Sequence, residues 1–483
     1  MSYCLTRVQR AILPMLVGAL TASAAPLPAA QVNGARVTTI AWETDAQVGK
    51  VIIRLDAPVT YRTMASPTSI LVDLWQARLG EWQSQTVVHP FVQGVRVNQL
   101  TPDVARVQID LRRPARYKTY MTTEPSTVTV VIIPPELATA SLPRSVAYEA
   151  LRAHTRAGTT GVHLLRINPE DPELEIRPVL AVDMVSGTET TSTIATRHEA
   201  VAAVNGGYFG GPAMPLGLVV INGELVSLPL PRRSVLAFPH AGPPLIRDFQ
   251  FAGRVYAQKD QWAPITGVNS LPQPGGMTVF MPQYGPLTPP VALGAVVRRD
   301  IVERVPSGRI LIPRDGYVLT ASEGDTEFLA HLHPGQRLAL SLDLDPDLHV
   351  VNALGGGPRL VKGGRAFVPF AWESFSSPLT WRRAARTAVG ITTLGKLLLV
   401  TVDGGSRQNP GMTLPEMGAL MVSLGAQDAM NLDGGGSATM VVGGRIVNTP
   451  SDGFERMVAS ALVVLRRPVE SDRVVKIPSW AAP

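Results

Sequence analysis

The chain has 483 residues, of which 45% are hydrophobic and 17% charged, with 43 glycines and 42 prolines. This composition is too apolar for a disordered polypeptide, and the glycines lack the period of collagen. The length predicts two or three globular units. The formal charge is +6, but no run of five basic residues occurs, which argues against a nucleic-acid partner.

Residues 1–30 have the pattern of a secretory signal peptide. Arg7 and Arg10 precede an apolar run, and small residues follow at 22–25. Its removal would also remove Cys4, the only cysteine, and with it any disulfide, zinc–thiolate site or cysteine nucleophile. No later segment has eighteen uncharged apolar residues, so we expect no transmembrane segment in the mature chain. We therefore expect an exported protein that is periplasmic, bound to the cell envelope or released from the cell.

Residues 36–134 contain short alternating runs separated by turn residues, which predicts an all-β unit. An internal repeat is visible in it. The strand pattern at residues 51–55 recurs at 107–111, and the pattern at 70–74 is echoed at 128–132. Two copies of one strand pattern predict two similar sheets packed face to face, a β-sandwich.

This duplicated unit resembles the AMIN domain, a module that places envelope enzymes on cell-wall glycans. The resemblance implies glycan localisation and a cell-wall or envelope glycan as partner. A β-sandwich that acts only as a spacer is the alternative. Residues 135–147, which are rich in proline and small residues, read as a linker.

Residues 148–468 are predicted to form an α+β domain with more strand than helix, followed by a tail at 469–483. A short helix is expected at 192–199 and a better one at 414–424. Thr413 and Glu416 form a capping box at the start of the second helix, and Gly425 ends it. The stretch 210–350 is rich in proline and poorly patterned, so its layout is not predicted. The fold class is thus mixed, an all-β sandwich followed by a strand-rich α+β domain.

Three apolar strands of this second unit end in the same way. Asn205, Asp403 and Asp433 each close a strand and are followed by glycines, and Gly355 opens a similar glycine run without the polar residue. A single Asx-Gly pair would be explained by a hairpin turn. Three of them predict loops gathered around one pocket, where glycine lets backbone N–H groups approach a ligand closely.

Several motifs in this unit resemble the phosphodiester glycosidase family. They are Ala203-Val-Asn-Gly-Gly-Tyr-Phe209, Gly355-Gly-Gly-Pro-Arg-Leu360, Arg386-Thr-Ala-Val-Gly390, Gly411-Met-Thr-Leu-Pro-Glu416, Asn431-Leu-Asp-Gly-Gly-Gly-Ser437 and Asn448-Thr-Pro-Ser-Asp-Gly-Phe-Glu-Arg456. The similarity spans about residues 148–465. It implies a hydrolase that removes a sugar from a phosphodiester, as the mammalian uncovering enzyme removes N-acetylglucosamine.

The candidate residues suit that chemistry. Cleavage between sugar carbon and oxygen needs a carboxylate that activates water or attacks directly, and Asp433 is the first candidate, Asp403 the second and Glu416 the weakest. A phosphomonoester departs with little proton donation, so one carboxylate can do most of the work. A charged phosphodiester needs N–H donors and guanidinium groups. The predicted substrate-binding residues are Asn205, Gly206, Arg386, Asn431, Gly434, Gly435, Gly436, Ser437 and Arg456.

Structural roles compete with several of these assignments. Glu416 has a reason to exist as a helix cap, Asn205 can make an Asx turn, and Ser437 can cap a turn. The sequence shows no required cofactor. Ca²⁺ or Mg²⁺ at Asp403 and Asp433 stays open, whereas zinc is disfavoured because His331 and His333 have no third ligand nearby.

Two other functions fit the same sequence. A phosphodiesterase would cut phosphorus from oxygen in the same linkage, and a non-catalytic peptidoglycan-binding protein would use both domains for adhesion. The sugar, the group to which it is linked, retention or inversion, and the oligomeric state are not specified by the sequence.

Overall fold

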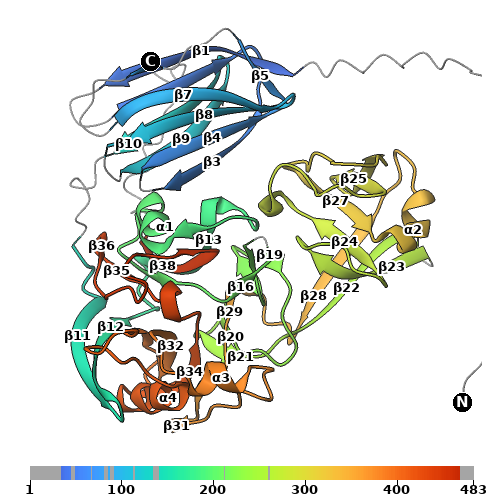
Figure 1. The fold of residues 1–483 in the computed structure, drawn as a ribbon. Coiled ribbons are helices and arrows are strands. Elements are labelled where there is room, and N and C mark those ends of the chain that lie inside the picture. The colour runs from blue at the N-terminus through green and yellow to red at the C-terminus, as the bar shows by residue number, and fades with distance from the viewer. Residues whose placement is uncertain are drawn as a thin grey trace, which may run out of the picture.

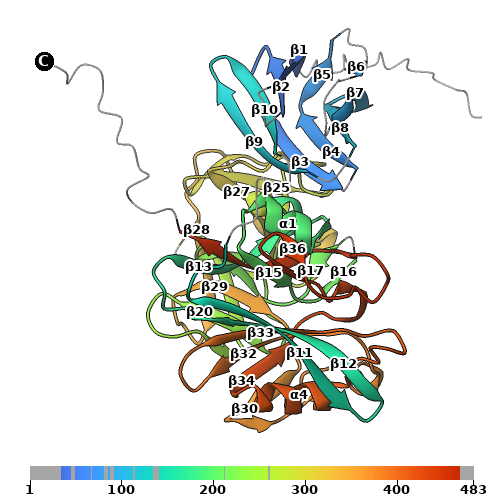
Figure 2. The same cartoon turned by 90° about the vertical axis from the view of Figure 1, so that its left-hand side faces the viewer.

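The computed structural model describes residues 34–44, 49–66, 68–80, 85–86, 92–112, 115–133, 141–211, 213–258 and 261–467. The predicted signal peptide, the first half of the predicted linker and the C-terminal tail lie outside these residues. Figure 1 shows the N-terminal β unit at one end of a larger strand-rich body, and Figure 2 shows the two sheets of that unit side by side.

The N-terminal unit is a sandwich of two five-stranded sheets. One has the order β5-β1-β2-β10-β9 and the other β3-β4-β8-β7-β6. The strands are β1 Ala35–Thr44, β2 Gly49–Leu55, β3 Thr60–Ser66, β4 Ser69–Trp75, β5 Ala77–Leu79, β6 Gln85–Thr86, β7 Val92–Thr101, β8 Val104–Leu111, β9 Arg116–Thr123 and β10 Ser126–Ile133.

The predicted repeat is built across both sheets. β2 of the first copy pairs with β10 of the second, with Ile53 opposite Val128, and β4 pairs with β8, with Val72 opposite Val107. Each sheet therefore combines strands from both copies. Alternate residues of β8 are buried, as the period of a half-buried strand requires. The inward faces of both sheets share one apolar core.

The larger body contains three sheets around one core. Their orders are β11-β12-β33-β32-β34-β30-β31, β13-β38-β15-β35-β36 and β19-β18-β29-β20-β21. The strands are β11 Val146–Thr155, β12 Gly158–Ile167, β13 Leu174–Leu180, β15 Ala202–Asn205, β18 Val219–Ile221, β19 Glu224–Ser227, β20 Val235–Pro239, β21 Leu245–Arg247, β29 Val350–Gly355, β30 Arg359–Lys362, β31 Arg365–Ala366, β32 Arg386–Thr392, β33 Leu397–Val402, β34 Ala426–Asn431, β35 Met440–Val442, β36 Arg445–Ile446 and β38 Ser460–Arg466.

Two short ribbons and three of the four helices of the described residues complete this body, and the fourth packs among residues 250–345. β14 Glu189–Thr190 pairs with β37 Met457–Val458, and β16 Phe209–Gly210 pairs with β17 Met214–Pro215. The helices are α1 Thr191–Arg197, α2 Glu327–Ala330, α3 Ser377–Trp381 and α4 Leu414–Ser423, with 3₁₀ turns η2 Ala181–Asp183, η3 Pro282–Tyr284, η4 Glu323–Asp325 and η5 Gly435–Ser437. No helix of the described residues is long and apolar enough to cross a bilayer.

Helix α4 covers the outer face of the seven-stranded sheet. Its Leu414, Met417 and Met421 are buried against Val400 and Ala388 of that sheet. The predicted capping box is formed, because the Thr413 hydroxyl accepts from the Glu416 amide and the Glu416 carboxylate accepts from the Thr413 amide. Burial of three such side chains stabilises this packing by several kcal/mol, about 1.5–3 for each.

Residues 250–345 of the stretch with no predicted layout form a further seven-stranded sheet, which shares a core with Val220, Val235 and Ala353 of the sheet that contains β18, β20 and β29. Its order is β26-β25-β27-β24-β23-β22-β28. The strands are β22 Gln250–Gln258, β23 Gln261–Val268, β24 Met277–Phe280, β25 Gly294–Arg298, β26 Ile301–Arg304, β27 Gly316–Ala321 and β28 Ala339–Asp345. Figure 1 shows this sheet projecting to one side of the body, joined through β22 and β28.

The order of strands in the seven-stranded sheet positions two of the polar strand ends. β33 and β34 both pair antiparallel with β32, which lies between them. They therefore run in the same direction and end at the same edge of the sheet. Asp403 and Asp433 follow these two ends.

Candidate active site

The glycine-rich loops after β15, β29 and β34 interlock. The Asp433 amide donates to the carbonyl of Gly206 at 3.2 Å, and the Gly357 amide donates to that of Asn431 at 2.7 Å. Gly207 lies so close to Gly355 that a Cβ on Gly207 would stand 2.2 Å from its carbonyl oxygen. Residue 207 must be glycine, because a side chain would collide with the Gly355 carbonyl. The structure thus brings three of the four glycine-rich strand ends into direct contact.

Asn205 is a buried residue that connects these glycine-rich loops through hydrogen bonds. Its Oδ1 accepts from the Thr387 hydroxyl at 2.7 Å and from the Thr439 amide at 3.2 Å, and its Nδ2 donates to the Asp433 carbonyl at 2.7 Å. The side chain is fully buried. Because these contacts occupy both ends of the amide, Asn205 positions the backbone of Asp433. We therefore assign Asn205 a structural role and not the predicted direct contact with substrate.

Asp433 is half-buried at the start of the loop after β34. Its Oδ1 accepts from the Gly434 amide at 2.9 Å. Burial raises the pKa of this carboxyl above its ordinary value, while Ser437, the Gly434 amide and the Arg456 guanidinium oppose the rise. Ser437 lies close enough to lower that pKa, yet its buried hydroxyl makes no hydrogen bond of ordinary geometry to any described residue. The Ser437 hydroxyl lies beside the Asp433 carboxylate.

Fewer of the three glycine amides after Asp433 are free to bind a ligand than the sequence predicts. The Gly434 amide is engaged by Asp433 itself, and the Gly435 amide donates to the Ala385 carbonyl at 2.8 Å. Among the described residues only the Gly436 amide of the three has no partner. The predicted cradle of three N–H groups is therefore reduced to one, because the turn consumes the other two.

Gly436 is glycine because two side chains press against it. A Cβ there would lie 2.0 Å from an Asp452 carboxylate oxygen and 2.2 Å from Nη2 of Arg456. Arg456 donates to Asp452 through Nε at 3.0 Å and Nη2 at 2.7 Å. Arg456 thus lies beside the Asp433 turn, but its charge is shared with Asp452.

Arg386 is almost wholly buried beneath the same turn and is paired with no carboxylate of the described residues. Its Nε donates to the Met412 carbonyl at 3.0 Å, and its Nη2 donates to the carbonyls of Leu379 and Arg382. Burial lowers its pKa, and Tyr208 opposes the change. Three backbone carbonyls fix the guanidinium, so it supplies a positive field to the site.

Asn431 connects the turn to Tyr208, which the sequence did not single out as a functional residue. Its Nδ2 donates to the Tyr208 hydroxyl at 2.7 Å, and its buried Oδ1 has no partner among the described residues. The Tyr208 hydroxyl donates to the Gly357 carbonyl at 3.0 Å. Burial raises the pKa of Tyr208 and the nearby charge of Asp433 raises it further. Tyr208 is therefore a neutral hydrogen-bonding group beside the carboxylate.

Asp403 lies at the same sheet edge as Asp433 but has its own contacts. Its Oδ1 accepts from the Thr449 amide at 2.8 Å, and its Oδ2 lies 3.5 Å from Nε2 of His163. Nδ1 of His163 is 2.9 Å from the Tyr148 hydroxyl. One strand separates the two aspartates, so their backbones are roughly 10 Å apart by ordinary strand spacing. The loop 448–456 contacts both turns.

Glu416 is held at the N-terminus of α4. Both its oxygens are engaged, by the Thr413 amide and hydroxyl, by the Arg383 guanidinium and by the Arg156 amide. Burial alone would raise the pKa of Glu416, but these donors lower it. Glu416, the weakest of the three catalytic candidates, therefore acts as a helix cap. We assign it no role in proton transfer.

A buried carboxylate next to the loop after β29 was not predicted. Glu373 accepts from the Ser234 amide and hydroxyl at 2.9 and 3.0 Å and from the Arg359 amide at 2.8 Å, which fixes the loop after β29. Arg233 lies 3.6 Å above the ring of Phe375, next to Tyr208. Neither Glu373 nor Arg233 follows a strand and precedes a glycine run, so the pattern that identified Asn205, Asp403 and Asp433 does not include them.

No group of three or more His, Cys, Asp or Glu among the described residues is placed to hold a metal ion. Asp403 and Asp433 do not share a contact. The open prediction of Ca²⁺ or Mg²⁺ gains no geometric support from them.

Two protein-family models match parts of the chain. Residues 292–465 match the phosphodiester glycosidase family model, and residues 39–132 match the AMIN domain model. Both matches confirm the resemblances drawn from the motifs. Asp403, Asp433, Glu416, Arg386 and Arg456 lie inside the first match, whereas Asn205 and Gly206 precede it.

Curated relatives match over short stretches. The N-acetylglucosamine-1-phosphodiester alpha-N-acetylglucosaminidase of Mus musculus is 45% identical over 151 residues, which is 29% of this chain and 26% of that protein. The Bos taurus enzyme is 46% identical over 69 residues, 14% of this chain and 13% of that protein. A prophage-derived uncharacterized protein of Bacillus subtilis, YomE, is 42% identical over 79 residues, 16% and 12%. The chain thus spans about a quarter or less of these relatives.

Two solved structures share the fold over most of the chain. A hypothetical protein from Synechocystis has a TM-score of 0.61 at 22% identity and covers 90% of this chain and 81% of its own. A protein from Burkholderia pseudomallei K96243, whose description is that of an exported protein, has a TM-score of 0.53 at 22% identity and covers 88% and 96%.

Proposed function

We propose that this chain, with its phosphodiester glycosidase domain at residues 292–465 and its AMIN domain at 39–132, hydrolyses the bond between a sugar and the phosphate of a sugar 1-phosphodiester. The observation that carries the proposal is the environment of Asp433. A half-buried carboxylate stands where three glycine-rich loops meet, beside Arg456 and above the buried charge of Arg386.

In this mechanism Asp433 acts on the sugar carbon, either directly or through a water molecule that it activates. The phosphate leaves as a weakly basic monoester, so the leaving oxygen needs little proton donation. The free Gly436 amide, the Ser437 hydroxyl and Arg456 stand beside the carboxylate as donors to the phosphate oxygens. Tyr208 and Asn431 are hydrogen-bonded to each other beside the carboxylate and are neutral.

Asp403 has a secondary role in this mechanism. Its contacts with His163 and Thr449 hold it in a different group of residues, with one strand between it and Asp433. We assign it to substrate positioning, with the His163 and Tyr148 side chains as its hydrogen-bonded support.

The proposed location is the periplasm or cell envelope. The AMIN domain match supports a role in localisation, and a cell-wall or envelope glycan is the proposed partner. The signal peptide proposed at residues 1–30 lies outside the described residues.

The test is hydrolysis of a panel of sugar 1-phosphodiesters by the full chain and its Asp433→Asn variant. We expect free sugar and a phosphomonoester as products, and a fall in turnover of about a thousand-fold or more for the variant, as for other essential carboxylates. The melting temperature should change little. Asp428→Asn, on the same strand β34, is the control and should retain activity. Sugar 1-phosphate as product would instead establish a phosphodiesterase, and no turnover by the wild type would favour a binding protein.

A further inference from the structure

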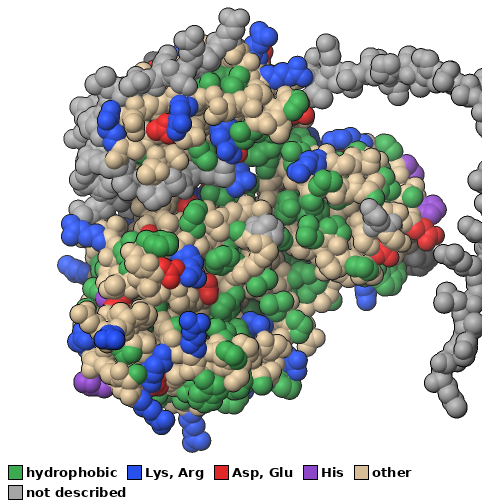
Figure 3. Space-filling view, viewed as in Figure 1, with side chains coloured by type: hydrophobic (Ala, Val, Ile, Leu, Met, Phe, Trp, Pro, Cys, Tyr) green, Lys and Arg blue, Asp and Glu red, His purple; other side chains and the backbone are tan. Residues whose placement is uncertain are grey.

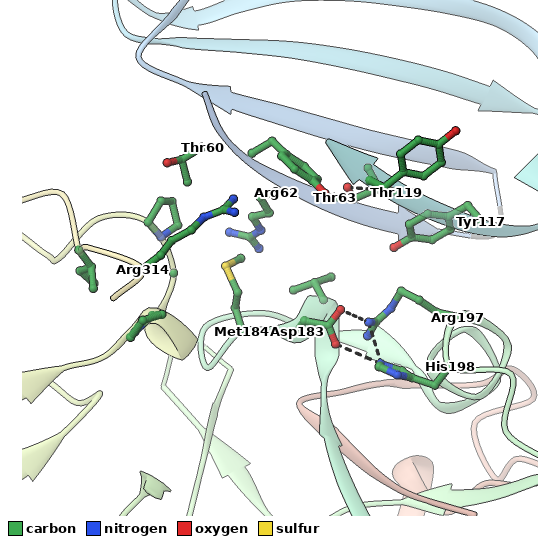
Figure 4. A pocket seen from close by; sticks show the side chains of 17 residues that line it. Thr60, Arg62, Thr63, Tyr117, Thr119, Asp183, Met184, Arg197, His198 and Arg314 are labelled. Carbon is green, nitrogen blue, oxygen red and sulfur yellow. Dashed lines mark hydrogen bonds and ion pairs between the residues drawn. The ribbon is translucent and has the colours of Figure 1, made fainter. Parts of the chain in front are cut away.

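A hollow of about 800 Å³ lies between the sandwich and the glycosidase body, away from Asp433. Its upper wall consists of residues from β3 and β9, and its lower wall of residues from η2, α1 and the segments 282–286 and 312–314 (Figure 4). Its volume lies within the range of ligand-binding pockets in proteins. The hollow exists only because the two units meet.

The hollow carries positive charge that its own residues do not balance. Arg62 of β3 has Asp73 as a nearby carboxylate, but Asp73 is already bound by Arg106 through both oxygens, at 2.6 and 2.8 Å. The Arg62 Nη2 reaches only the Ser186 carbonyl, at 3.4 Å, and its buried Nε has no partner among the described residues. A buried charged donor without a partner is costly, so this group calls for an acceptor.

Arg314 adds a second cation from the opposite wall. It is exposed and forms no ion pair within the described ranges, and Figure 4 shows it extending into the hollow. Arg197, by contrast, is neutralised by Asp183 and by the fully buried Glu189. The unbalanced charge of the hollow is therefore that of Arg62 and Arg314. Basic side chains also lie along this boundary in the space-filling view (Figure 3).

Polar and aromatic groups complete the lining. Tyr117 is only 3% exposed, and its hydroxyl has no hydrogen-bond partner among the described residues. In Figure 4 it points down toward the lower wall. Tyr120 is 48% exposed and presents its ring at the rim, and Thr60 adds a hydroxyl. Hydroxyl groups beside the exposed ring of Tyr120 match the polar and apolar faces of a sugar ring.

We propose that this hollow binds a saccharide that carries an acidic group, a phosphate or a carboxylate, with Arg62 and Arg314 on the acidic group and Tyr117 on a sugar hydroxyl. The ligand contacts both units and so fixes the sandwich on the glycosidase body. This site is separate from the Asp433 turn, and the proposal does not depend on the proposed hydrolysis.

The experiment measures saccharide binding by calorimetry, using the full chain with Asp433→Asn so that no turnover intervenes. The probes are trigalacturonate, glucose 6-phosphate, inorganic phosphate and the neutral trisaccharide maltotriose. We expect one or both acidic saccharides to bind, and maltotriose and inorganic phosphate to bind more weakly. The two acidic probes distinguish a carboxylate from a phosphate as the recognised group.

Variants locate the binding. Arg62→Gln combined with Arg314→Gln should weaken it by roughly ten-fold or more, as loss of charge-assisted hydrogen bonds does. Arg365→Gln, an exposed arginine on β31, should leave it unchanged. Tyr117→Phe should weaken binding without lowering the melting temperature, because the hydroxyl has no structural partner to lose.

Two results would overturn the proposal. One is that neither acidic saccharide binds more tightly than maltotriose and inorganic phosphate. The other is binding that survives the double arginine substitution. Failure here leaves hydrolysis by the wild type untouched, since Arg62 and Arg314 take no part in it. The double variant in the active chain should cleave a small soluble phosphodiester at the wild-type rate.

Discussion

Asp433 differs from the other acidic candidates in what its oxygens do. Glu416 has both oxygens engaged in a cap, and Asp403 is bound by the Thr449 amide with His163 alongside. Asp433 is tied only to its own turn, next to a hydroxyl that lacks a partner. A carboxylate that must react has to keep an oxygen available, and this is the residue whose surroundings permit it.

The raised pKa of Asp433 predicts a shifted acid limb in the pH profile of kcat/KM. The carboxylate form should be lost as pH falls through a value above the ordinary aspartate value of about 3.9. Arg456→Gln removes a cation that lowers this pKa, so the limb should move to higher pH. Arg365→Gln is the control for a lost exposed charge. A limb that stays in place, or moves to lower pH, in Arg456→Gln would show that Asp433 does not set it.

Asn205 predicts a stability effect rather than a binding effect. Asn205→Ala leaves the Thr387 hydroxyl, the Thr439 amide and the Asp433 carbonyl without their partner in a fully buried site. We expect a loss of about 3 kcal/mol in the free energy of unfolding, since each orphaned group costs about 1–3. Urea denaturation measures it. Asn98→Ala, at an exposed position, should change it by less than about 0.5 kcal/mol.

At this scale the sequence predicted positions better than roles. The polar residues at strand ends were identified from the glycines that follow them, and the loops after β15 and β34 do meet. The hydrogen bonds of Asn205 could not be predicted, because its partners Thr387, on β32, and Thr439, just before β35, are distant in sequence. Tyr208 and His163 carried only weak signals, as single polar residues in or beside strands.

Among the elements, α4 and its cap were the most predictable. The Thr413-x-x-Glu416 spacing and the apolar period specify the helix locally, without knowledge of its neighbours. The order of the strands was not predictable in the same way. β32, β33 and β34 are antiparallel neighbours whose pairing places two aspartates at one edge, and such pairing depends on contacts distant in sequence.

The cap predicts stability losses of different size for two substitutions of Glu416. Glu416→Gln keeps a side chain that can accept from the Thr413 amide, so turnover should persist with a small loss of stability. Glu416→Ala removes the cap and should cost about 1 kcal/mol. The lowered pKa means that the charged form stabilises the fold above about pH 4.5, and that this stabilisation is lost as pH falls through the folded value. If Glu416→Gln lost turnover but kept its melting temperature, Glu416 would have to be a catalytic residue after all.

The molecule consists of a sandwich with an internal repeat and a body in which neighbouring strands of a sheet are often far apart in sequence. The sandwich was predictable because each strand pattern occurs twice, although the exchange of strands between sheets was not. The sheet formed by β22 to β28 was missed because proline-rich loops separate its strands, and because β27 and β28 pair out of chain order.

The most direct measurement of the central claim is the position of the isotope after hydrolysis of a sugar 1-phosphodiester in ¹⁸O-labelled water. Attack at the sugar carbon places the label on the released sugar, and attack at phosphorus places it on the phosphate. We expect label on the sugar with the wild-type chain and no labelled product with Asp433→Asn. Label on the phosphate would contradict the glycosidase assignment.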